Sequence, residues 1–593
     1  MSSLQNILQL LTEDQKRNSI PIILMVIMMG VIEAAGVFSV VPFLSIVSNP
    51  ALIETNTVIN QAYIFFKQYN INTPDQFLIL IALSSVFIIV LSAFFRTYAM
   101  HKVNHFLEKS RNILCSRLFK KFIDQQYSFY IERDTSELSK IVISEVDHLV
   151  DRLIRPVFLG IAYVISVLLI MAVLLLIDPL ITSIAITSMG ALYFFIYFVL
   201  RSYLAKQGSN VTEALQDRFE AISNPFKAIK TIKLAGKENI YINRLSKPLD
   251  SFETSMTGYL TSNQAPSFIV EAIIFASILA VALVAIMTSG GVYSSTFQDL
   301  IPLLGVYSFA AIRIKPALHV IYQGWIGVLY GDSSLDNIVN ELKLQTINPE
   351  ESDSGREMLI KEKISLKDIS YYYPEAEMPS LSGINIAVKF GSSVGIIGSS
   401  GAGKSTLVDI ILGLIQPTFG EMVVDGIKMQ KYNLRQWQKN LGYVPQEIVL
   451  SSSSLRENIA FGVETEDIDD DMVYRAAKLA ELSSFIDINS RSAFDAQVGD
   501  NGIKLSGGQR QRIGIARALY HQPKVLVFDE ATSALDLATE KRVMDSIMSL
   551  RGRHTIFIVT HRIATVRHCD QIYIMDEGVV KAKGSFEQLQ LSN

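Results

Sequence analysis

A chain of 593 residues exceeds the length that one hydrophobic core usually organises, so at least two domains are expected. Hydrophobic residues make up 49% of the chain and charged residues only 19%, below the roughly 25% of ordinary soluble domains, so part of the chain is expected to be solvated by lipid. The net charge of -4 gives no reason to expect nucleic acid as a partner, and Cys115 and Cys569 are not expected to form a disulfide or a zinc site.

Six segments before residue 331 are long and apolar enough to span a membrane, which takes roughly 20 mainly apolar residues. They cover approximately 20–48, 77–95, 156–177, 180–200, 268–289 and 300–328. The first segment is too long for a signal peptide and lacks a small-residue cleavage pattern, so we expect it to stay in the membrane.

The distribution of Lys and Arg predicts the orientation, because these residues are retained on the cytoplasmic side of short loops. They crowd the loops between spans two and three and between spans four and five, whereas residues 49–76 and 290–299 contain only Lys67. Both termini are therefore predicted to be cytoplasmic. The two cationic loops carry apolar residues at helical spacing, so spans two to five are expected to continue as helices into the cytosol, either to carry motion or as a rigid stalk.

Residues 56–70 form a short apolar run on the predicted external side. The run is too short to span a membrane. It predicts either an interfacial amphipathic helix lying against the outer leaflet or an ordered external loop packed on its neighbours.

Charged residues inside the spans are functional candidates, because burying them in lipid is costly. They are Glu33, Glu271, Arg313 and Lys315, with Arg96 near the cytoplasmic end of its span. Arg313 and Lys315 suit an anionic cargo group such as a phosphate, and the glutamates are expected to pair with them across helices. Cargo contact and structural pairing both remain open for the two cations.

Residues 1–335 are thus predicted to form an all-α membrane domain of six transmembrane helices with long cytoplasmic extensions, followed by a linker over 336–361. From 362 to 593, short β-branched strands alternate with helices, which predicts an α/β domain. The apolar strand 393–397 leads into a glycine-rich loop and then a helix. The loop consists of Gly398, Ser399, Ser400, Gly401, Ala402, Gly403, Lys404, Ser405 and Thr406.

This loop predicts a P-loop that binds ATP. Its glycines let backbone N–H groups curl around the phosphates, and the helix N-terminus adds its positive end. Lys404 is placed to reach the β and γ phosphates, and Ser405 to offer its hydroxyl to Mg²⁺. A second apolar strand, 524–528, ends in Asp529 and Glu530; we expect Asp529 to hold the magnesium shell and Glu530 to polarise the attacking water.

The tract Leu505, Ser506, Gly507, Gly508, Gln509 resembles the signature of ATP-binding cassette transporters. Further positions are similar to motifs of that family: Tyr373 to the aromatic that stacks on adenine, Gln446 to the loop that faces the membrane domain and reaches Mg²⁺, residues 533–536 to the loop at the dimer interface, and His561 to the switch histidine near the γ-phosphate. The resemblance implies an intact ATPase site.

The resemblance covers nearly the whole chain and implies a half-transporter. It implies a homodimer, or a heterodimer with a similar partner, in which ATP lies between the P-loop of one cassette and the signature of the other. Residues 135–138 and 224–237 resemble the two coupling loops, and 498–502 departs slightly from the usual exporter tract, with Asp500 where Glu is common.

Residues 30–44, the external segment and residues 309–316 resemble the bacterial lipid-linked oligosaccharide flippases. This resemblance implies movement of a polyprenyl-pyrophosphate glycan to the outer leaflet of the bacterial inner membrane, with Arg313, Lys315 and Arg96 as substrate candidates. A lipid or multidrug exporter is the alternative within transport, and an ATP-gated channel or regulator is the alternative of another class. Glu530 and His561 argue against a channel, which needs ATP binding more than turnover. A soluble DNA-repair ATPase is set aside because spanning helices are present.

Overall fold

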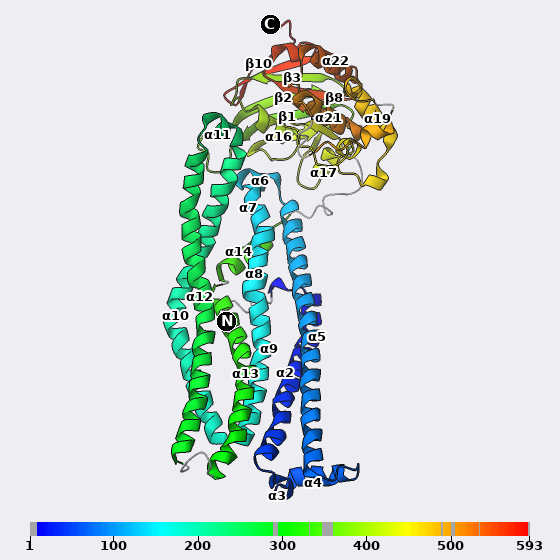
Figure 1. Ribbon diagram of the computed structural model, residues 1–593. Coiled ribbons are helices and arrows are strands. Elements are labelled where there is room, and N and C mark those ends of the chain that lie inside the picture. Colours follow the sequence, from blue (N-terminus) through cyan, green and yellow to red (C-terminus); the bar gives the residue numbers. More distant parts are fainter. Residues whose placement is uncertain are drawn as a thin grey trace. The chain divides into compact units, whose positions relative to one another are not determined.

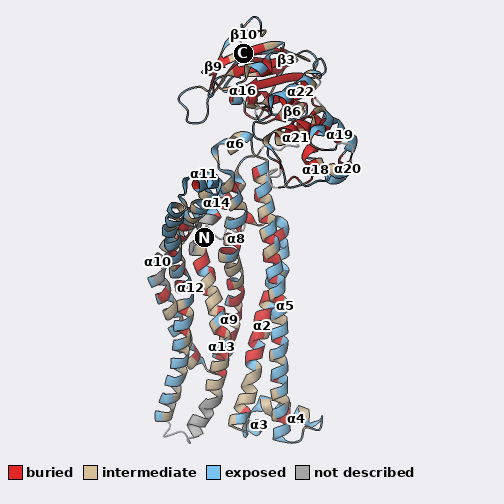
Figure 2. Ribbon diagram, turned by 45° about the horizontal axis from the view of Figure 1, so that its top comes forward, coloured by how far each residue is buried: buried red, intermediate tan, exposed pale blue. Residues whose placement is uncertain are grey.

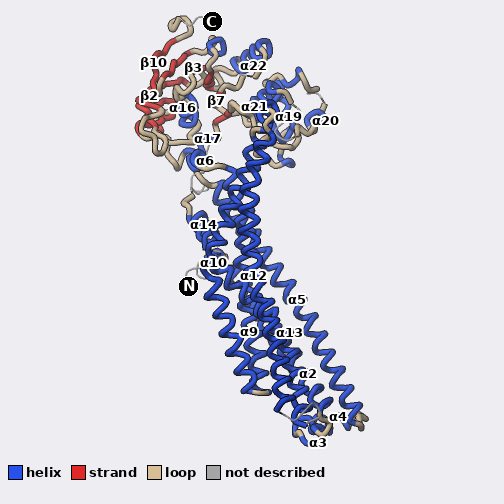
Figure 3. The backbone as a smooth tube through the Cα atoms, turned by 60° about the vertical axis from the view of Figure 1, so that its left-hand side comes forward, coloured by secondary structure: helices blue, strands red, loops and turns tan. Residues whose placement is uncertain are grey.

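The computed structural model describes residues 9–288, 295–330, 332–346, 358, 360–487, 490–499, 505–532 and 534–590 (Figure 1). The chain divides into two compact units. The membrane unit is Met1–Ile123 with Thr135–Leu344, and the nucleotide-binding unit is Asp124–Asp134 with Gln345–Asn593. Among these residues, strands occur in the nucleotide-binding unit alone, as Figure 3 shows.

All regular secondary structure in the described residues of the membrane unit is helical. Its helices are α2 (Glu13–Ser48), α3 (Leu52–Thr55), α4 (Thr57–Lys67), α5 (Pro74–Ile123), α7 (Thr135–Lys140), α8 (Val146–Leu149), α9 (Arg155–Ile177), α10 (Pro179–Lys227), α11 (Ile229–Ala235), α12 (Glu238–Thr288), α13 (Ser295–Tyr330) and α14 (Asp332–Lys343). Two π-helical stretches, Ile141–Glu145 and Val150–Ile154, join α7, α8 and α9 into one long helix.

The prediction of six spans is confirmed, because six helices are long and apolar enough to cross a membrane. Their continuation well beyond the apolar stretches is also confirmed, since α5, α10 and α12 run for 50, 49 and 51 residues. Many large apolar side chains of these helices are exposed, and Figure 2 shows the membrane helices largely in the exposed and intermediate colours. Lipid rather than a protein interior is the expected solvent for such a surface.

Glycines allow a close helix contact in the membrane unit. A Cβ on Gly324 would lie 2.7 Å from the Pro156 carbonyl oxygen, and one on Gly327 would lie 2.5 Å from that of Arg152. Only glycine permits α13 to approach the helix that leads into α9 so closely, as is usual for small residues at membrane helix interfaces. Elsewhere α2 packs on α5 and α9, and α10 packs on α12.

The nucleotide-binding unit has two sheets. The four-stranded antiparallel sheet has the order β2-β1-β4-β5 and the six-stranded sheet the order β10-β9-β3-β8-β7-β6, parallel from β9 to β6. The strands are β1 (Lys363–Tyr371), β2 (Leu381–Lys389), β3 (Ser393–Gly398), β4 (Phe419–Val424), β5 (Ile427–Lys428), β6 (Leu441–Val444), β7 (Val525–Asp529), β8 (Thr555–Thr560), β9 (Gln571–Asp576) and β10 (Val579–Gly584). The helices used below are α6 (Tyr127–Glu132), α16 (Lys404–Ile411), α21 (Gly507–Tyr520) and α22 (Leu537–Met548).

The central strands β7 and β8 are continuous apolar runs that are buried on both faces, which is typical of a parallel sheet covered by helices. The predicted α/β P-loop architecture is therefore confirmed. Of the segment predicted as a linker, 336–361, the first part belongs to α14, where Leu335, Ile338 and Val339 are buried.

Candidate functional site

The sheet order brings three predicted loops to one edge. Strand β8 lies between β3 and β7, and all three run parallel, so their carboxyl ends meet at the same edge. The P-loop follows β3, Glu530 follows β7 and His561 follows β8. Residues far apart in sequence are thus neighbours in one site.

The P-loop backbone requires its glycines. Gly401 and Gly403 have φ of 82° and 89°, in the left-handed region. A Cβ on Gly403 would lie 2.6 Å from the Ser380 carbonyl oxygen, and one on Gly398 would lie 2.3 Å from that of Met575, whereas Gly401 has open space around it. The loop is therefore held from behind, and its backbone remains free at Gly401 for close approach of phosphate groups, so it fits ATP.

Side chains at the start of α16 are ordered around this loop. The buried Lys404 donates from Nζ to the carbonyl oxygens of Gly398, at 2.9 Å, and Ser399, at 2.7 Å. Ser405 is exposed, while the buried Thr406 places its hydroxyl 3.1 Å from that of Tyr373. Lys404 is thus positioned within the loop, and Tyr373, the predicted adenine partner, lies beside the first turn of α16.

Three predicted residues come together on the Glu530 carboxylate. Gln446 donates from Nε2 to Glu530 Oε2 at 3.0 Å, and His561 Nδ1 lies 3.1 Å from Glu530 Oε1. Glu530 has a φ of 48°, and its N–H donates to the carbonyl of Val559 at 2.8 Å. This left-handed turn directly after β7 fixes the carboxylate at the sheet edge, where it joins the other two side chains.

Asp529 lies at the end of β7 beside a residue that sequence reasoning missed. Burial raises the pKa of Asp529, the Glu530 carboxylate raises it further, and Lys404 opposes the shift. The Tyr443 side chain of β6 hydrogen-bonds Asp529, and burial also raises the pKa of Tyr443. A tyrosine in a strand is usually core, so only the pairing of β6 with β7 identifies this contact.

The donor set fits magnesium better than a tightly ligated transition metal. Where the structure describes the chain, no group of three or more His, Cys, Asp or Glu side chains could hold a metal ion. The predicted ligands Ser405, Gln446 and Asp529 instead offer a hydroxyl, an amide and one carboxylate. Mg²⁺ usually takes few protein ligands of this oxygen type and completes its shell with waters and substrate phosphates.

The signature residues lie at the start of α21. Ser506 accepts from the Gln509 N–H at 3.2 Å, and the Gln509 side chain accepts from the Ser506 N–H at 2.8 Å, which forms a capping box. Neither residue hydrogen-bonds the P-loop within the described ranges. Ser533 and residues 500–502, which were singled out for the interface loop and the exporter tract, lie outside the described residues.

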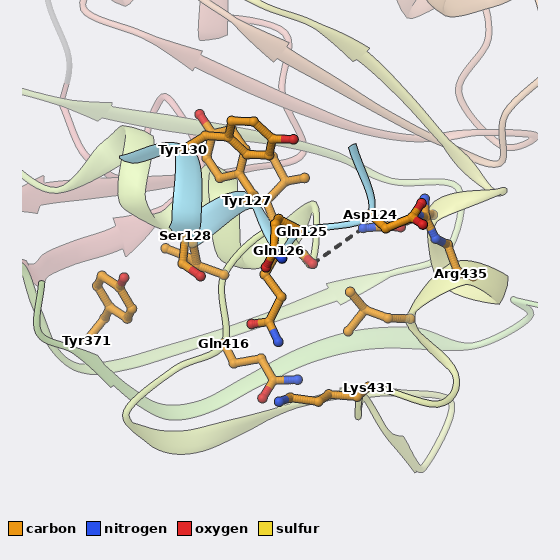
Figure 4. A pocket seen from close by; sticks show the side chains of 15 residues that line it. Asp124, Gln125, Gln126, Tyr127, Ser128, Tyr130, Tyr371, Gln416, Lys431 and Arg435 are labelled. Atoms are coloured by element: carbon orange, nitrogen blue, oxygen red, sulfur yellow. Dashed lines mark hydrogen bonds between the residues drawn. The ribbon is translucent and has the colours of Figure 1, made fainter. Parts of the chain in front are cut away.

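The residues at the first predicted coupling loop and those just before it belong to different units. Residues 135–138 begin α7 of the membrane unit, whereas Asp124–Asp134, which contains α6, belongs to the nucleotide-binding unit. Figure 4 shows Tyr127 and Tyr130 at a cavity of about 450 Å³, with Tyr371 and Gln416 among its other lining residues. The assignment of residues 135–138 to the first coupling loop stays a prediction, and aromatic residues that belong to the nucleotide-binding unit directly precede them.

The charged residues predicted in the membrane spans form two ion pairs, and one cation has no carboxylate partner among the described residues. Glu33, which is 5% exposed, lies 3.4 Å from Arg96 and accepts from the Ser166 hydroxyl at 2.9 Å. Lys315 forms an ion pair with Glu271, as predicted. Arg313 has no ion-pair partner among the described residues and lies over the Phe309 ring at 5.8 Å. The prediction that Glu33 pairs with Arg313 or Lys315 is wrong, because its carboxylate lies against Arg96 of α5 and Ser166 of α9.

The external segment forms the ordered helix α4. One side contributes Tyr63 and Phe66 to a cluster with Phe77. The other side exposes apolar side chains: Val58, Ile64 and Phe65 are 76%, 54% and 53% exposed. The helix is therefore packed on its neighbours and also presents an apolar face, so it combines features of both predicted alternatives.

Two family models match the sequence: the ABC transporter model over residues 381–533 and the ABC transporter transmembrane region over residues 38–309. The chain is 28% identical over 514 residues to the heterocyst differentiation ATP-binding protein HepA of Nostoc sp., covering 85% of this chain and 81% of that protein. It is 28% identical over 478 residues to the ATP-dependent lipid A-core flippase of Saccharophagus degradans, covering 80% and 78%.

The fold is similar to that of a solved bacterial Atm1-family ABC exporter with ATP bound. The TM-score is 0.76 at 20% identity, over 97% of this chain and 96% of that one. The two family models together include both the membrane helices and the P-loop. The chain therefore belongs to the ABC transporter family, as a half-transporter of the exporter type that hydrolyses ATP.

Proposed function

We propose that this exporter moves a lipid-linked oligosaccharide, a polyprenyl-pyrophosphate glycan, from the cytoplasmic to the outer leaflet of the bacterial inner membrane. The observation that carries the proposal is Arg313, a cation of a membrane span without a carboxylate partner among the described residues. An uncompensated guanidinium in a span is costly, and a pyrophosphate would satisfy it through paired hydrogen bonds. Arg96 and Lys315 already have partners, so they are weaker candidates.

The exposed face of α4 supports the same cargo. An apolar helix face at the external end of the membrane unit suits the headgroup boundary of the outer leaflet. We assign to it contact with the polyprenyl tail, since that boundary is where a tail would be presented after transfer. The Lys- and Arg-rich loops support a cytoplasmic location for both termini, because such residues are retained on that side of the membrane.

In the ATPase site, Lys404 and the P-loop N–H groups bind the phosphates, and Tyr373 stacks on adenine. Mg²⁺, held by Ser405, Gln446 and Asp529, would neutralise charge that develops on the phosphates. Glu530 accepts a proton from the attacking water, and His561 holds Glu530 in place from one side while Gln446 does so from the other.

A homodimer completes this site. Ser506 and Gln509 do not hydrogen-bond the P-loop in the described part of the chain, so they are available to the ATP of a second copy. The end of α10 and helix α11 expose apolar side chains, with Phe226 at 70% and Leu234 at 90% exposed. Such side chains in a charged helical extension suit docking onto the partner chain.

A lipid flippase without an oligosaccharide preference is the second candidate. It is favoured by the relatives named lipid A-core flippases, including one of Cupriavidus pinatubonensis at 31% identity over 61% of this chain and 60% of that protein. The intact contact of Glu530 with His561 disfavours an ATP-gated channel, which requires no efficient hydrolysis.

The test is the ATPase activity of the purified chain in nanodiscs, with polyprenyl-pyrophosphate oligosaccharide, with polyprenyl monophosphate, or with lipid A-core. We expect the first to stimulate hydrolysis and Arg313→Ala to abolish the stimulation while the basal rate stays within about twofold, because Arg313 lies outside the ATPase site. Arg313→Lys should retain part of the response, since it keeps the charge but not the bidentate geometry.

A charge swap provides the matched control. Glu271→Lys combined with Lys315→Glu keeps the ion pair between α12 and α13, and should leave stimulation intact if Lys315 has a structural role. Stimulation by lipid A-core alone would replace the proposed cargo with that of the second candidate. Equal stimulation of the wild type and Arg313→Ala would remove the pyrophosphate contact.

A further inference from the structure

A buried carboxylate of α22 lies outside the set of residues assigned to ATP. Glu540 is 8% exposed, and both of its oxygens accept hydrogen bonds. Oε1 accepts from the hydroxyls of Thr532, at 2.9 Å, and Thr565, at 3.0 Å, and Oε2 accepts from Arg562 Nη1 at 3.1 Å. Since an unpaired buried charge would be strongly destabilising, these three donors account for the presence of an acid here.

The three donors come from two loops of the proposed ATPase site. Thr532 lies two residues after Glu530, in the loop that leaves β7. Arg562 directly follows His561, and Thr565 lies in the turn Ile563–Val566 that continues the same loop after β8. One carboxylate therefore ties the loop that carries Glu530 to the loop that carries His561.

The two loops that Glu540 links carry Glu530 and His561, whose mutual position matters for hydrolysis. Glu530 and His561 are 3.1 Å apart, and the Arg562 N–H donates to the Thr560 hydroxyl at 3.0 Å, which braces the His561 loop on its other side. The sheet fixes the strand ends, but the side chains beyond them depend on loop conformation. A shift of about 1 Å at a reacting group can cost on the order of 100-fold in rate.

We propose that Glu540 is a positioning residue for ATP hydrolysis, which holds the Glu530 and His561 loops in register through Thr532, Thr565 and Arg562. The inference rests on the roles proposed above for Glu530 and His561. The residues proposed to bind the nucleotide, Lys404 and Tyr373, are not hydrogen-bonded to Glu540 in the described structure. Loss of Glu540 therefore affects turnover and spares ATP binding.

Glu540→Gln is a sharp test, because the side chain keeps its shape and its amide oxygen still accepts from the two threonines. Its amide NH₂ group, however, points donors at the Arg562 guanidinium, so the charge-assisted contact to Arg562, the residue next to His561, is lost while that from Thr565 remains. For the full chain in nanodiscs, we expect kcat for ATP hydrolysis to fall about 30-fold while KM for ATP stays within about twofold.

Two further variants keep the test decisive. Asp545→Asn removes an exposed carboxylate from the same helix and should behave as wild type. Thr532→Val removes one of three donors and leaves the charge paired with Arg562, so it should fold and lower kcat about threefold at unchanged KM.

If Glu540→Gln lowered kcat and ATP affinity by the same factor, its role would be merely structural and the proposal would be overturned. If Glu540→Gln does not fold, a wild-type kcat in Thr532→Val would overturn it as well. The catalytic role proposed for Glu530 is tested separately. If Glu530→Gln still hydrolysed ATP, that role would be rejected whatever the result for Glu540→Gln.

Discussion

Replacing Glu530 with glutamine should lower kcat for ATP hydrolysis by at least about 100-fold, since a positioned general base typically contributes that much or more. The amide has nearly the shape of the carboxylate and still accepts from Gln446, but it cannot take a proton from water. ATP binding should persist, because the P-loop and Tyr373 are untouched. Phosphate release by the chain in nanodiscs, beside equilibrium binding of labelled ATP, measures both quantities.

The matched control for this variant is Glu577→Gln, an exposed glutamate of the same unit that, like Glu530, has positive φ. It should leave hydrolysis unchanged. If Glu530→Gln hydrolysed ATP at the wild-type rate, the base would have to be sought elsewhere at the carboxyl edge of the sheet.

Lys404→Ala should remove hydrolysis and also weaken ATP binding by about tenfold or more, because a charge-assisted contact to phosphate is lost. The structure adds a second reason: Lys404 Nζ bridges the carbonyl groups of Gly398 and Ser399 and so stabilises the loop. The distinguishing measurement is nucleotide affinity, which falls here and persists in Glu530→Gln.

Lys428→Ala, which removes an exposed lysine paired with Glu421 on the antiparallel sheet, is the charge-matched control and should bind ATP normally. Equal affinities of Lys404→Ala and the wild type for ATP would contradict the phosphate contact.

The ATPase motifs were predictable because their chemistry is local. A glycine-rich loop between a strand and a helix defines the P-loop from neighbouring residues, and two acids after an apolar strand define Asp529 and Glu530. The contacts among Gln446, Glu530 and His561 then follow from the order in which parallel strands pair. Six spans were predictable for a similar reason, since apolar length alone decides whether a helix can cross a membrane.

Contacts between distant helices were not predictable. Charge alone offered Glu33 several cations, and the packing of α2 on α5 selected Arg96. The role of Glu540 could not be predicted from its own neighbours in sequence, because its three partners lie in two other loops. The membership of α6 in the nucleotide-binding unit was not predictable either, because its aromatic residues carry no motif.

The close approach of α13 to the helix entering α9 restricts how the membrane unit can rearrange. With a Gly324 Cβ position only 2.7 Å from a carbonyl oxygen, the two backbones have no layer of side chains between them that could repack. Sliding of one helix along the other is therefore disfavoured, and the two helices are expected to move as one rigid body. Arg313 is part of α13 and would then follow every displacement of α9. The proposed contact to the cargo would therefore move together with these helices, without a hinge between them.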